Sequence, residues 1–214
     1  MNKRSVAIRS LRSGGLMAAI ALLGGCFLAE DDNANPIIPD DALAYPLKFG
    51  DGRECEEQDD GELSCQRASF ERLAEGGYSI TVYQEITTDE DGEQSGESGT
   101  TSSEYKLRAL RGAGVPADTY LVQTVSASER ERFLGLLKRS SRGGWLKISP
   151  NCDKLSPEAF VRFMNQGWLH TEEGATLDSL TCHIVRDGLD DARLYSILSS
   201  TKSSGDNKIL FSGG

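Results

Sequence analysis

The amino-acid sequence predicts an α+β fold, mostly an antiparallel β-meander or small barrel with two or three short C-terminal helices. Three observations carry this prediction. Apolar and polar residues alternate over short runs, most clearly from Tyr105 to Ala109. The runs follow one another with Gly, Asp or Asn turns between them, whereas parallel strands would need long crossover segments. Clear helix-start signals come only after residue 150.

Seven segments have the composition and periodicity of strands. In chain order they are 45–49, 78–82, 105–109, 119–125, 133–138, 145–148 and 208–211. Pro46 has no amide donor, so the first segment belongs at a sheet edge or a strand start, and Gly50-Asp51-Gly52 ends it. The segments at 119–125 and 133–138 are denser in apolar residues, which is typical of central strands.

A long polar stretch separates the second and third of these strands. Residues 87–103 are acidic, Gly, Ser, Thr and Gln residues without one apolar side chain, and we expect a mobile acidic loop near 87–104. Within it, Asp89-Glu90-Asp91-Gly92-Glu93 has carboxylates for a cation but places Gly92 fourth, where an EF-hand loop has its Gly sixth. We therefore interpret this run as a solvated loop.

The helices are expected in the last third of the chain. Ser156-Pro157-Glu158 combines an N-cap, a first-turn Pro and an acidic residue near the positive end of the helix dipole, and Gly167 follows as a stop. Thr176 is a second candidate cap, although residues 182–185 have the alternative of forming a strand. Asp190-Asp191 begin a further helix, with Leu194, Ile197 and Leu198 on one face.

The first 25 residues predict a secretory signal peptide. They carry Lys3, Arg4, Arg9 and Arg12, no acidic residue, and then the apolar run 16–23. That run is much shorter than the ~20 apolar residues that a membrane-spanning helix needs. Without residues 1–25, the net charge changes from −10 to −14, because four basic residues and no acidic ones are lost.

The segment Leu23-Gly24-Gly25-Cys26 resembles the lipobox of bacterial lipoprotein precursors. The resemblance implies cleavage before Cys26, a diacylglyceryl thioether on its thiol, and acyl chains such as palmitate on its amine. Two or three acyl chains make a stable anchor, at ~0.8 kcal/mol per buried methylene. Phe27 in place of an aspartate after the cysteine implies sorting to the outer membrane, facing the periplasm.

The signal peptide and the lipobox divide the chain into three predicted parts. Residues 1–25 are the signal peptide, residues 26–44 are the lipidated cysteine with a flexible, polar, Pro-containing tether, and residues 45–214 are one β-rich domain. The strand series, notably Tyr120 to Gln123 and Phe133 to Leu137, resembles uncharacterised small β-rich lipoproteins of Gram-negative bacteria. That resemblance implies no activity.

Cysteine parity supports the assignment of Cys26 to the lipid. The other four are Cys55, Cys65, Cys152 and Cys182, an even number in an oxidising compartment. We expect two structural disulfides and favour the local pairs, Cys55 with Cys65 and Cys152 with Cys182. A metal site of Cys152, Cys182, His183 and His170 is the rival interpretation; it lacks any usual ligand spacing, so we predict no metal.

The sequence contains no recognisable catalytic constellation. No nucleophile elbow or phosphate-binding loop is present, and His170 and His183 are interpreted as surface or packing residues. The acidic charge argues against nucleic-acid partners. We therefore predict a membrane-anchored, non-catalytic binding or structural module, without a cofactor, whose partner is the bilayer and an envelope protein or wall component. The alternatives are an envelope hydrolase with a carboxylate site, or an inhibitor of a basic lysozyme-like enzyme.

Overall fold

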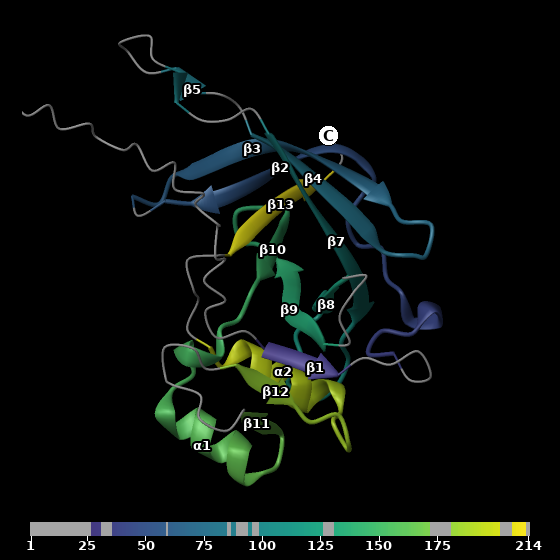
Figure 1. Ribbon diagram of the computed structural model, residues 1–214, viewed down its shortest axis with the longest axis vertical. Helices are drawn as coiled ribbons and strands as arrows, with labels where there is room; N and C mark the ends of the chain where they lie inside the picture. The colour runs from purple at the N-terminus through teal and green to yellow at the C-terminus, as the bar shows by residue number, and fades with distance from the viewer. Residues whose placement is uncertain are drawn as a thin grey trace, which may run out of the picture.

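Eight antiparallel strands close into a barrel in the computed structural model of the chain (Figure 1). The structure describes residues 27–30, 36–58, 60–84, 87–88, 94–95, 99–125, 131–171, 181–201 and 207–212. The barrel strands are β2 (Gly50–Glu57), β3 (Leu63–Arg72), β4 (Tyr78–Gln84), β7 (Gly99–Ala109), β8 (Tyr120–Thr124), β9 (Glu131–Arg139), β10 (Trp145–Ile148) and β13 (Lys208–Ser212). The fold is therefore mostly β, as predicted.

The C-terminal strand β13 makes the sheet a closed barrel rather than an open meander. From β2 to β10, each barrel strand is bonded to the next barrel strand along the chain. β13 then lies between the first and the last, pairing Ile209 with Cys55 on β2 and with Leu146 on β10. Closure satisfies the backbone groups at both edges of the meander.

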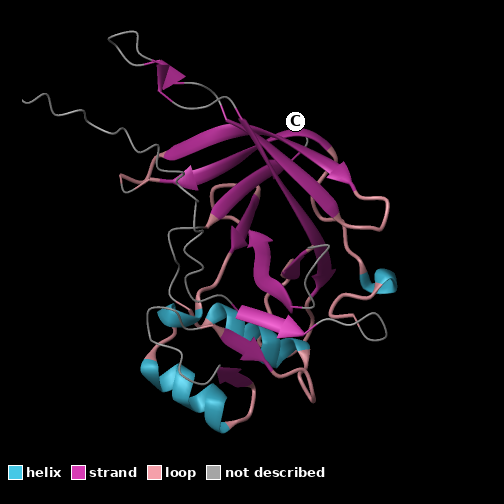
Figure 2. Cartoon of the chain, viewed as in Figure 1, coloured by secondary structure: helices cyan, strands magenta, loops and turns pink. Residues whose placement is uncertain are grey.

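A smaller layer continues the sheet below the barrel (Figures 1 and 2). β1 (Phe27–Glu30) is antiparallel to the first residues of β9 and parallel to β12 (Cys182–Ile184), which in turn pairs with β11 (Leu169–Thr171). The helices α1 (Pro157–Asn165) and α2 (Asp191–Ser199) lie in this part of the molecule. We call β1, β11, β12, α1 and α2 the basal layer.

The two parts have separate hydrophobic cores, and β9 contributes to both. Leu137 faces the barrel interior, whereas Leu134 and Leu136 pack with the basal layer. Alternate residues of one strand point to opposite faces, so a single strand serves two cores. The fully buried aromatic residues include Phe70 and Tyr78 in the barrel core and Phe27 and Phe163 in the basal core.

Both α-helices begin at the capping residues that the sequence predicts. Ser156 Oγ accepts a hydrogen bond from the Ala159 amide at 3.2 Å, and an Asp190 carboxylate oxygen accepts one from the Arg193 amide at 2.8 Å. Asp191, in the first turn of α2, also accepts a 2.6 Å bond from Arg108 of β7. The sequence left open whether residues 182–185 form a helix or a strand, and the structure has strand β12 at residues 182–184. The candidate cap Thr176 lies outside the described residues.

The structure differs from the predicted flexible tether at residues 27–30 and 36–44. Phe27 and Ile38 are each only 1 % exposed, and β1 is an interior strand of the sheet. Residues 40–42 form a short 3₁₀ helix, η1 (Asp40–Ala42). Polar and Pro residues dominate the composition of this stretch, and four residues are too few to show a strand period. Residues 26 and 31–35 lie outside the described residues.

The predicted strand at 45–49 is also wrong. Leu47 enters the barrel core from an irregular segment, and the first barrel strand begins where a turn was expected, at Gly50. β2 and β3 carry many charged residues, which hid their strand character. The predicted loop at 87–104 is shorter, because β7 begins at Gly99; the pair β5 (Thr87–Thr88) and β6 (Gln94–Ser95) lies within it, and the rest is not described.

No helix of the described residues has the length and apolar character required to cross a bilayer.

Candidate functional site

The inward-facing residues of the barrel change character from one end to the other. At one end they are aromatic and aliphatic, and Phe70, Tyr78 and Trp145 fill the interior. Toward the other end, the same strands turn polar residues inward. A polar cavity of about 360 Å³ remains there, lined by Glu54, Gln66, Ile80, Val82, Gln84, Thr101, Ser103, Tyr105, Lys147, Ser149 and Lys208.

The period of the strands places these polar side chains inside. Gln84 shares its face of β4 with Tyr78, Ile80 and Val82, and Lys147 shares its face of β10 with Trp145. Because residues two apart on a strand point the same way, an apolar inward row leads directly into a polar one. The cavity is thus built on rigid strands.

Two lysines lie in the wall of the polar cavity, and their environments differ. Lys208 Nζ is 2.9 Å from a carboxylate oxygen of Glu56 on the neighbouring strand β2. Lys147 Nζ instead donates a 2.8 Å hydrogen bond to the Tyr105 hydroxyl oxygen and lies 4.5 Å from the centroid of that ring. The partner of Lys147 is thus a hydroxyl group, whereas the partner of Lys208 is a carboxylate.

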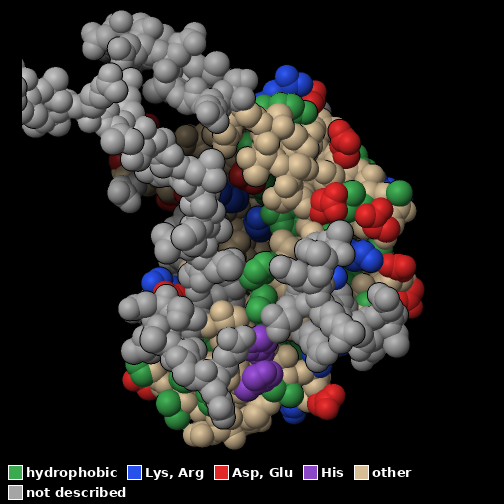
Figure 3. All heavy atoms as spheres, viewed as in Figure 1, with side chains coloured by type: hydrophobic (Ala, Val, Ile, Leu, Met, Phe, Trp, Pro, Cys, Tyr) green, Lys and Arg blue, Asp and Glu red, His purple; other side chains and the backbone are tan. Residues whose placement is uncertain are grey.

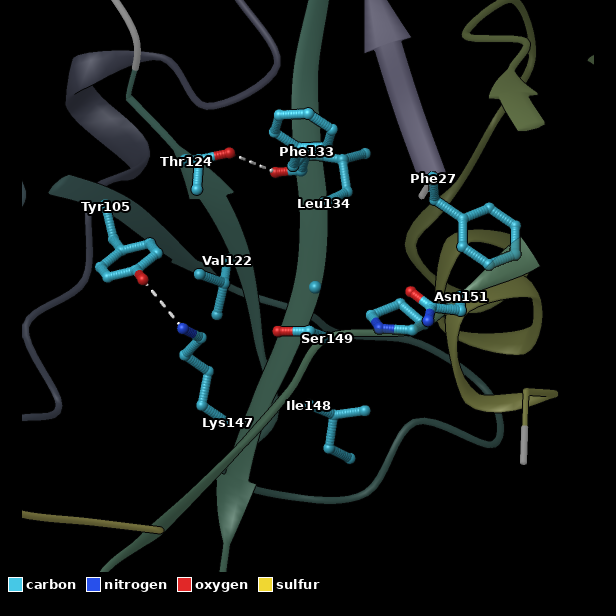
Figure 4. Close-up of a pocket in the computed structure, with 12 residues that line it drawn as sticks. Phe27, Tyr105, Val122, Thr124, Phe133, Leu134, Lys147, Ile148, Ser149 and Asn151 are labelled. Carbon is cyan, nitrogen blue, oxygen red and sulfur yellow. Dashed lines mark hydrogen bonds between the residues drawn. The ribbon is translucent and has the colours of Figure 1, made fainter. Parts of the chain in front are cut away.

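A second cavity, of about 300 Å³, adjoins the first and is mainly apolar (Figure 4). It lies between the barrel and the basal layer. Its lining is Phe27, Tyr105, Val122, Thr124, Phe133, Leu134, Gly135, Lys147, Ile148, Ser149, Pro150 and Asn151. We call it the apolar slot. Tyr105, Lys147 and Ser149 line both the polar cavity and the slot, so the two spaces meet at these residues.

The opposite end of the barrel is closed by Tyr78. Its hydroxyl accepts a 3.1 Å bond from the Leu47 amide and donates a 3.0 Å bond to the Leu47 carbonyl oxygen. Burial raises the pKa of Tyr78 well above its usual value, although the hydrogen bond from the Leu47 backbone opposes the rise. The phenol therefore stays neutral and ties residues 45–49 to the barrel core.

The four cysteines pair as the sequence favoured. Cys55 and Cys65 lie opposite one another on β2 and β3, with Cα atoms 4.0 Å apart. Cys152, at the start of the 3₁₀ helix η2 (Cys152–Lys154), is bonded to Cys182 of β12, with Cα atoms 5.8 Å apart. The first disulfide holds the hairpin at the polar end of the barrel, and the second is buried in the basal core.

The histidines meet on the basal layer. His170 and His183 are opposite residues of β11 and β12, and their rings stack with centroids 4.9 Å apart. The two rings reach the molecular surface below the barrel (Figure 3). Over the described residues, no group of three or more His, Cys, Asp or Glu side chains is arranged to hold a metal ion.

The remaining candidates contribute less. Cys26 and the acidic run 89–93 lie outside the described residues. A retaining or inverting glycosidase needs two carboxylates across its cleft. Among the described residues, Glu54 lines the polar cavity, and Glu56 adjoins it through its ion pair with Lys208. The hydrolase alternative stays a prediction.

The sequence contained a signal for the cavity that composition alone hides. Gln84, Lys147 and Lys208 each lie two residues from an apolar residue of the same strand that faces the barrel interior. A polar residue at such a position marks the end of a packed core. No protein-family model, curated protein or solved structure matches the chain.

Proposed function

We propose that this chain is a lipoprotein of the bacterial cell envelope, anchored through acylated Cys26, whose barrel binds a small ligand. The observation that carries the proposal is the polar cavity inside the closed barrel. Binding sites are typically concave spaces of ~300–1,000 Å³ with a few converging polar groups. The cavity has this size, and lysine, amide and hydroxyl groups from five strands converge on it.

The anchor is supported by the basic and apolar segments before Leu23-Gly24-Gly25-Cys26. Cleavage before Cys26 leaves every described residue in the mature protein, because the sheet begins at Phe27. Phe27 is 1 % exposed and pairs with β12, so the lipid attachment point is the residue directly before the sheet. The basal layer would therefore lie close to the bilayer, on the periplasmic side of the outer membrane.

The first experiment tests the anchor with Cys26→Ser, and Gly25→Ala as the matched control. Gly25→Ala keeps a small residue at the cleavage site and should remain lipidated. We expect Cys26→Ser to lose labelled palmitate and to leave the outer-membrane fraction. A Cys26→Ser protein that still takes up the label and stays in that fraction would contradict the anchor.

The second experiment tests ligand binding with two Trp variants on β7. Thr101 lines the polar cavity, whereas Thr100 faces the other side of the same strand. The chain from Phe27 onward, made without the signal peptide and Cys26 and called the soluble domain, is incubated with lipid and aqueous extracts of the envelope, re-isolated, and analysed by native mass spectrometry. We expect a compound that the original protein and Thr100→Trp retain and Thr101→Trp does not. Retention of no compound, or equal retention by all three, would contradict a barrel site.

A further inference from the structure

The polar cavity and the apolar slot are neighbours of opposite character. The polar cavity has carboxylate, lysine, amide and hydroxyl groups in its wall, whereas the slot is lined mainly by aliphatic and aromatic carbon. Tyr105, Lys147 and Ser149 belong to both walls. A ligand that spans this junction would have a polar end in the barrel and an apolar end in the slot.

Lys147 and Tyr105 determine which polar end fits at the junction. The Tyr105 oxygen accepts a bond from Lys147 Nζ, so the phenol's own proton is left to donate elsewhere. Lys147 has two further N–H groups, and among the described residues it has no carboxylate within ion-pair distance, unlike Lys208 beside Glu56. Together the pair presents a positive charge and several donors, which suits an anionic headgroup.

The apolar slot is open because two strand pairings end beside it. β10 leaves β9 after the pair Leu136 and Ile148, and β1 pairs with β9 only from Phe133 toward its start. Gly135 lies between these pairings and lines the slot; a Cβ there would come within 2.6 Å of the Ile148 carbonyl oxygen. Glycine at this position therefore allows the Ile148 carbonyl group to approach β9 closely at the edge of the slot.

The volume of the slot limits the apolar end of the ligand. A methylene group is close in size to a water molecule, which occupies ~30 Å³ in the liquid. The slot of about 300 Å³ therefore holds one chain of about ten carbons. Two long acyl chains exceed this volume, so we expect a ligand with a single chain.

We propose that the two cavities form one site for a single-chain amphiphile with an anionic headgroup. The headgroup binds Lys147 and Tyr105, and a chain of about ten carbons fills the apolar slot between Val122, Phe133 and Ile148. The inference rests on the proposed function, namely that the barrel binds a ligand, and specifies the chemistry of that ligand. The Lys147 ammonium would repel a cationic headgroup, and a neutral headgroup would accept its hydrogen bond without the added attraction between opposite charges.

Calorimetric titration of the soluble domain tests the charge requirement with three ten-carbon probes, decanoate, decanol and decyltrimethylammonium. We expect decanoate to bind about tenfold more tightly than either of the others, which is ~1.4 kcal/mol. Within a fatty-acid series, each methylene up to about ten carbons should strengthen binding about fourfold, because burial is worth ~0.8 kcal/mol per methylene. Butyrate should bind too weakly to measure.

Two variants assign the two ends of the ligand, and a third is the control. Lys147→Met keeps the aliphatic stem and should weaken decanoate about tenfold while leaving decanol unchanged. Val122→Phe fills the slot and should weaken both probes; Thr124→Phe, at a half-buried position of the same wall, replaces it if Val122→Phe melts early. Lys154→Met, at an exposed lysine bonded to Asp153, is the control and should change neither affinity.

Equal affinity for decanoate and decanol, or decanoate binding that survives Lys147→Met, overturns the proposal. If decanoate does not bind while an envelope compound is still retained in a Thr101-dependent way, the amphiphile is wrong and the barrel site stands. If neither is observed, both proposals fail.

Discussion

The two ends of the barrel interior are built from the same strands, but one end is packed with apolar side chains and the other encloses the polar cavity. On β3, Phe70 fills the apolar end, and Gln66, four residues earlier on the same face, lines the polar cavity. On β4, Tyr78 and Gln84 show the same change. Packing at one end stabilises the closed sheet, which lets the other end keep an unfilled, polar space. The comparison teaches that the packed core and the polar cavity, which we propose as the binding site, are separated along the barrel axis.

A disulfide and an ion pair join the strands at the polar end, where the cavity takes the place of a packed core. The Cys55–Cys65 disulfide joins β2 to β3, and the Lys208–Glu56 ion pair joins β13 to β2. These contacts keep the cavity wall closed where a hydrophobic core is missing. Four variants test this contrast, from the largest expected effect to the smallest.

Phe70→Ala should have the largest effect on stability. Phe70 is 0 % exposed in the barrel core, so the substitution leaves a cavity that the closed sheet has little freedom to collapse. We expect a loss of about 4 kcal/mol in the free energy of unfolding, measured by urea denaturation. A loss below ~1 kcal/mol would show that this end is not a packed core.

Removing the disulfide of the polar end should have the next largest effect. Cys55→Ser with Cys65→Ser releases a link between residues ten apart in sequence, and chain entropy predicts a cost of about 2–3 kcal/mol. The same pair of substitutions should weaken ligand retention, because the hairpin carries Glu54 and Gln66 of the cavity wall. Denaturation and native mass spectrometry measure the two effects. An unchanged urea midpoint would mean that other contacts hold this end.

Tyr78→Phe should cost about 2 kcal/mol, because it leaves the buried amide and carbonyl of Leu47 without their hydroxyl partner. Burial raises the pKa of Tyr78 in the folded state above its unfolded value of about 10. The folded protein therefore holds this proton more tightly, so the stabilisation is complete below pH ~10 and is lost as the pH rises further.

Unfolding titrations at about pH 8 and about pH 11 check this sign. The difference in stability between the original protein and Tyr78→Phe should narrow at the higher pH. A difference that stays constant across this range would show that Tyr78 ionises equally in both states.

Gln66→Ala should have the smallest effect. Gln66 faces the open polar cavity and is exposed, so we expect a change within ~0.5 kcal/mol. Because Gln66 and Phe70 share one face of β3, this variant is the matched control for Phe70→Ala. A large loss of stability from Gln66→Ala would contradict the interpretation that only the apolar end of the barrel is a packed core.

Much of the local structure could be predicted from the sequence because short-range chemistry determines it. The alternation at 105–109 predicted part of β7, and Ser156-Pro157 predicted the start of α1. Parity and proximity predicted both disulfides. The strand β2 was missed because its inward residues, including Glu54 and Glu56, line or adjoin a polar cavity and so have no apolar period.

The candidate site could not be predicted from the same patterns, because its walls come from strands far apart in the chain. Lys208 meets Glu56 across 152 residues, and Lys147 meets Tyr105 across 42. Phe27 reaches the slot from a segment whose composition indicated a tether. Strand alternation shows which way a side chain points, but not which neighbour faces it.

The sequence alone therefore determined the secondary-structure class, the helix caps, the cysteine pairs and the expectation of an anchor at Cys26, because each depends on residues close together in the chain. Only the tertiary structure decided that β13 closes a barrel, that β1 belongs to the sheet, and that a polar cavity meets an apolar slot at Lys147. These outcomes depend on which strands become neighbours, and that choice is made by the packing of the whole chain.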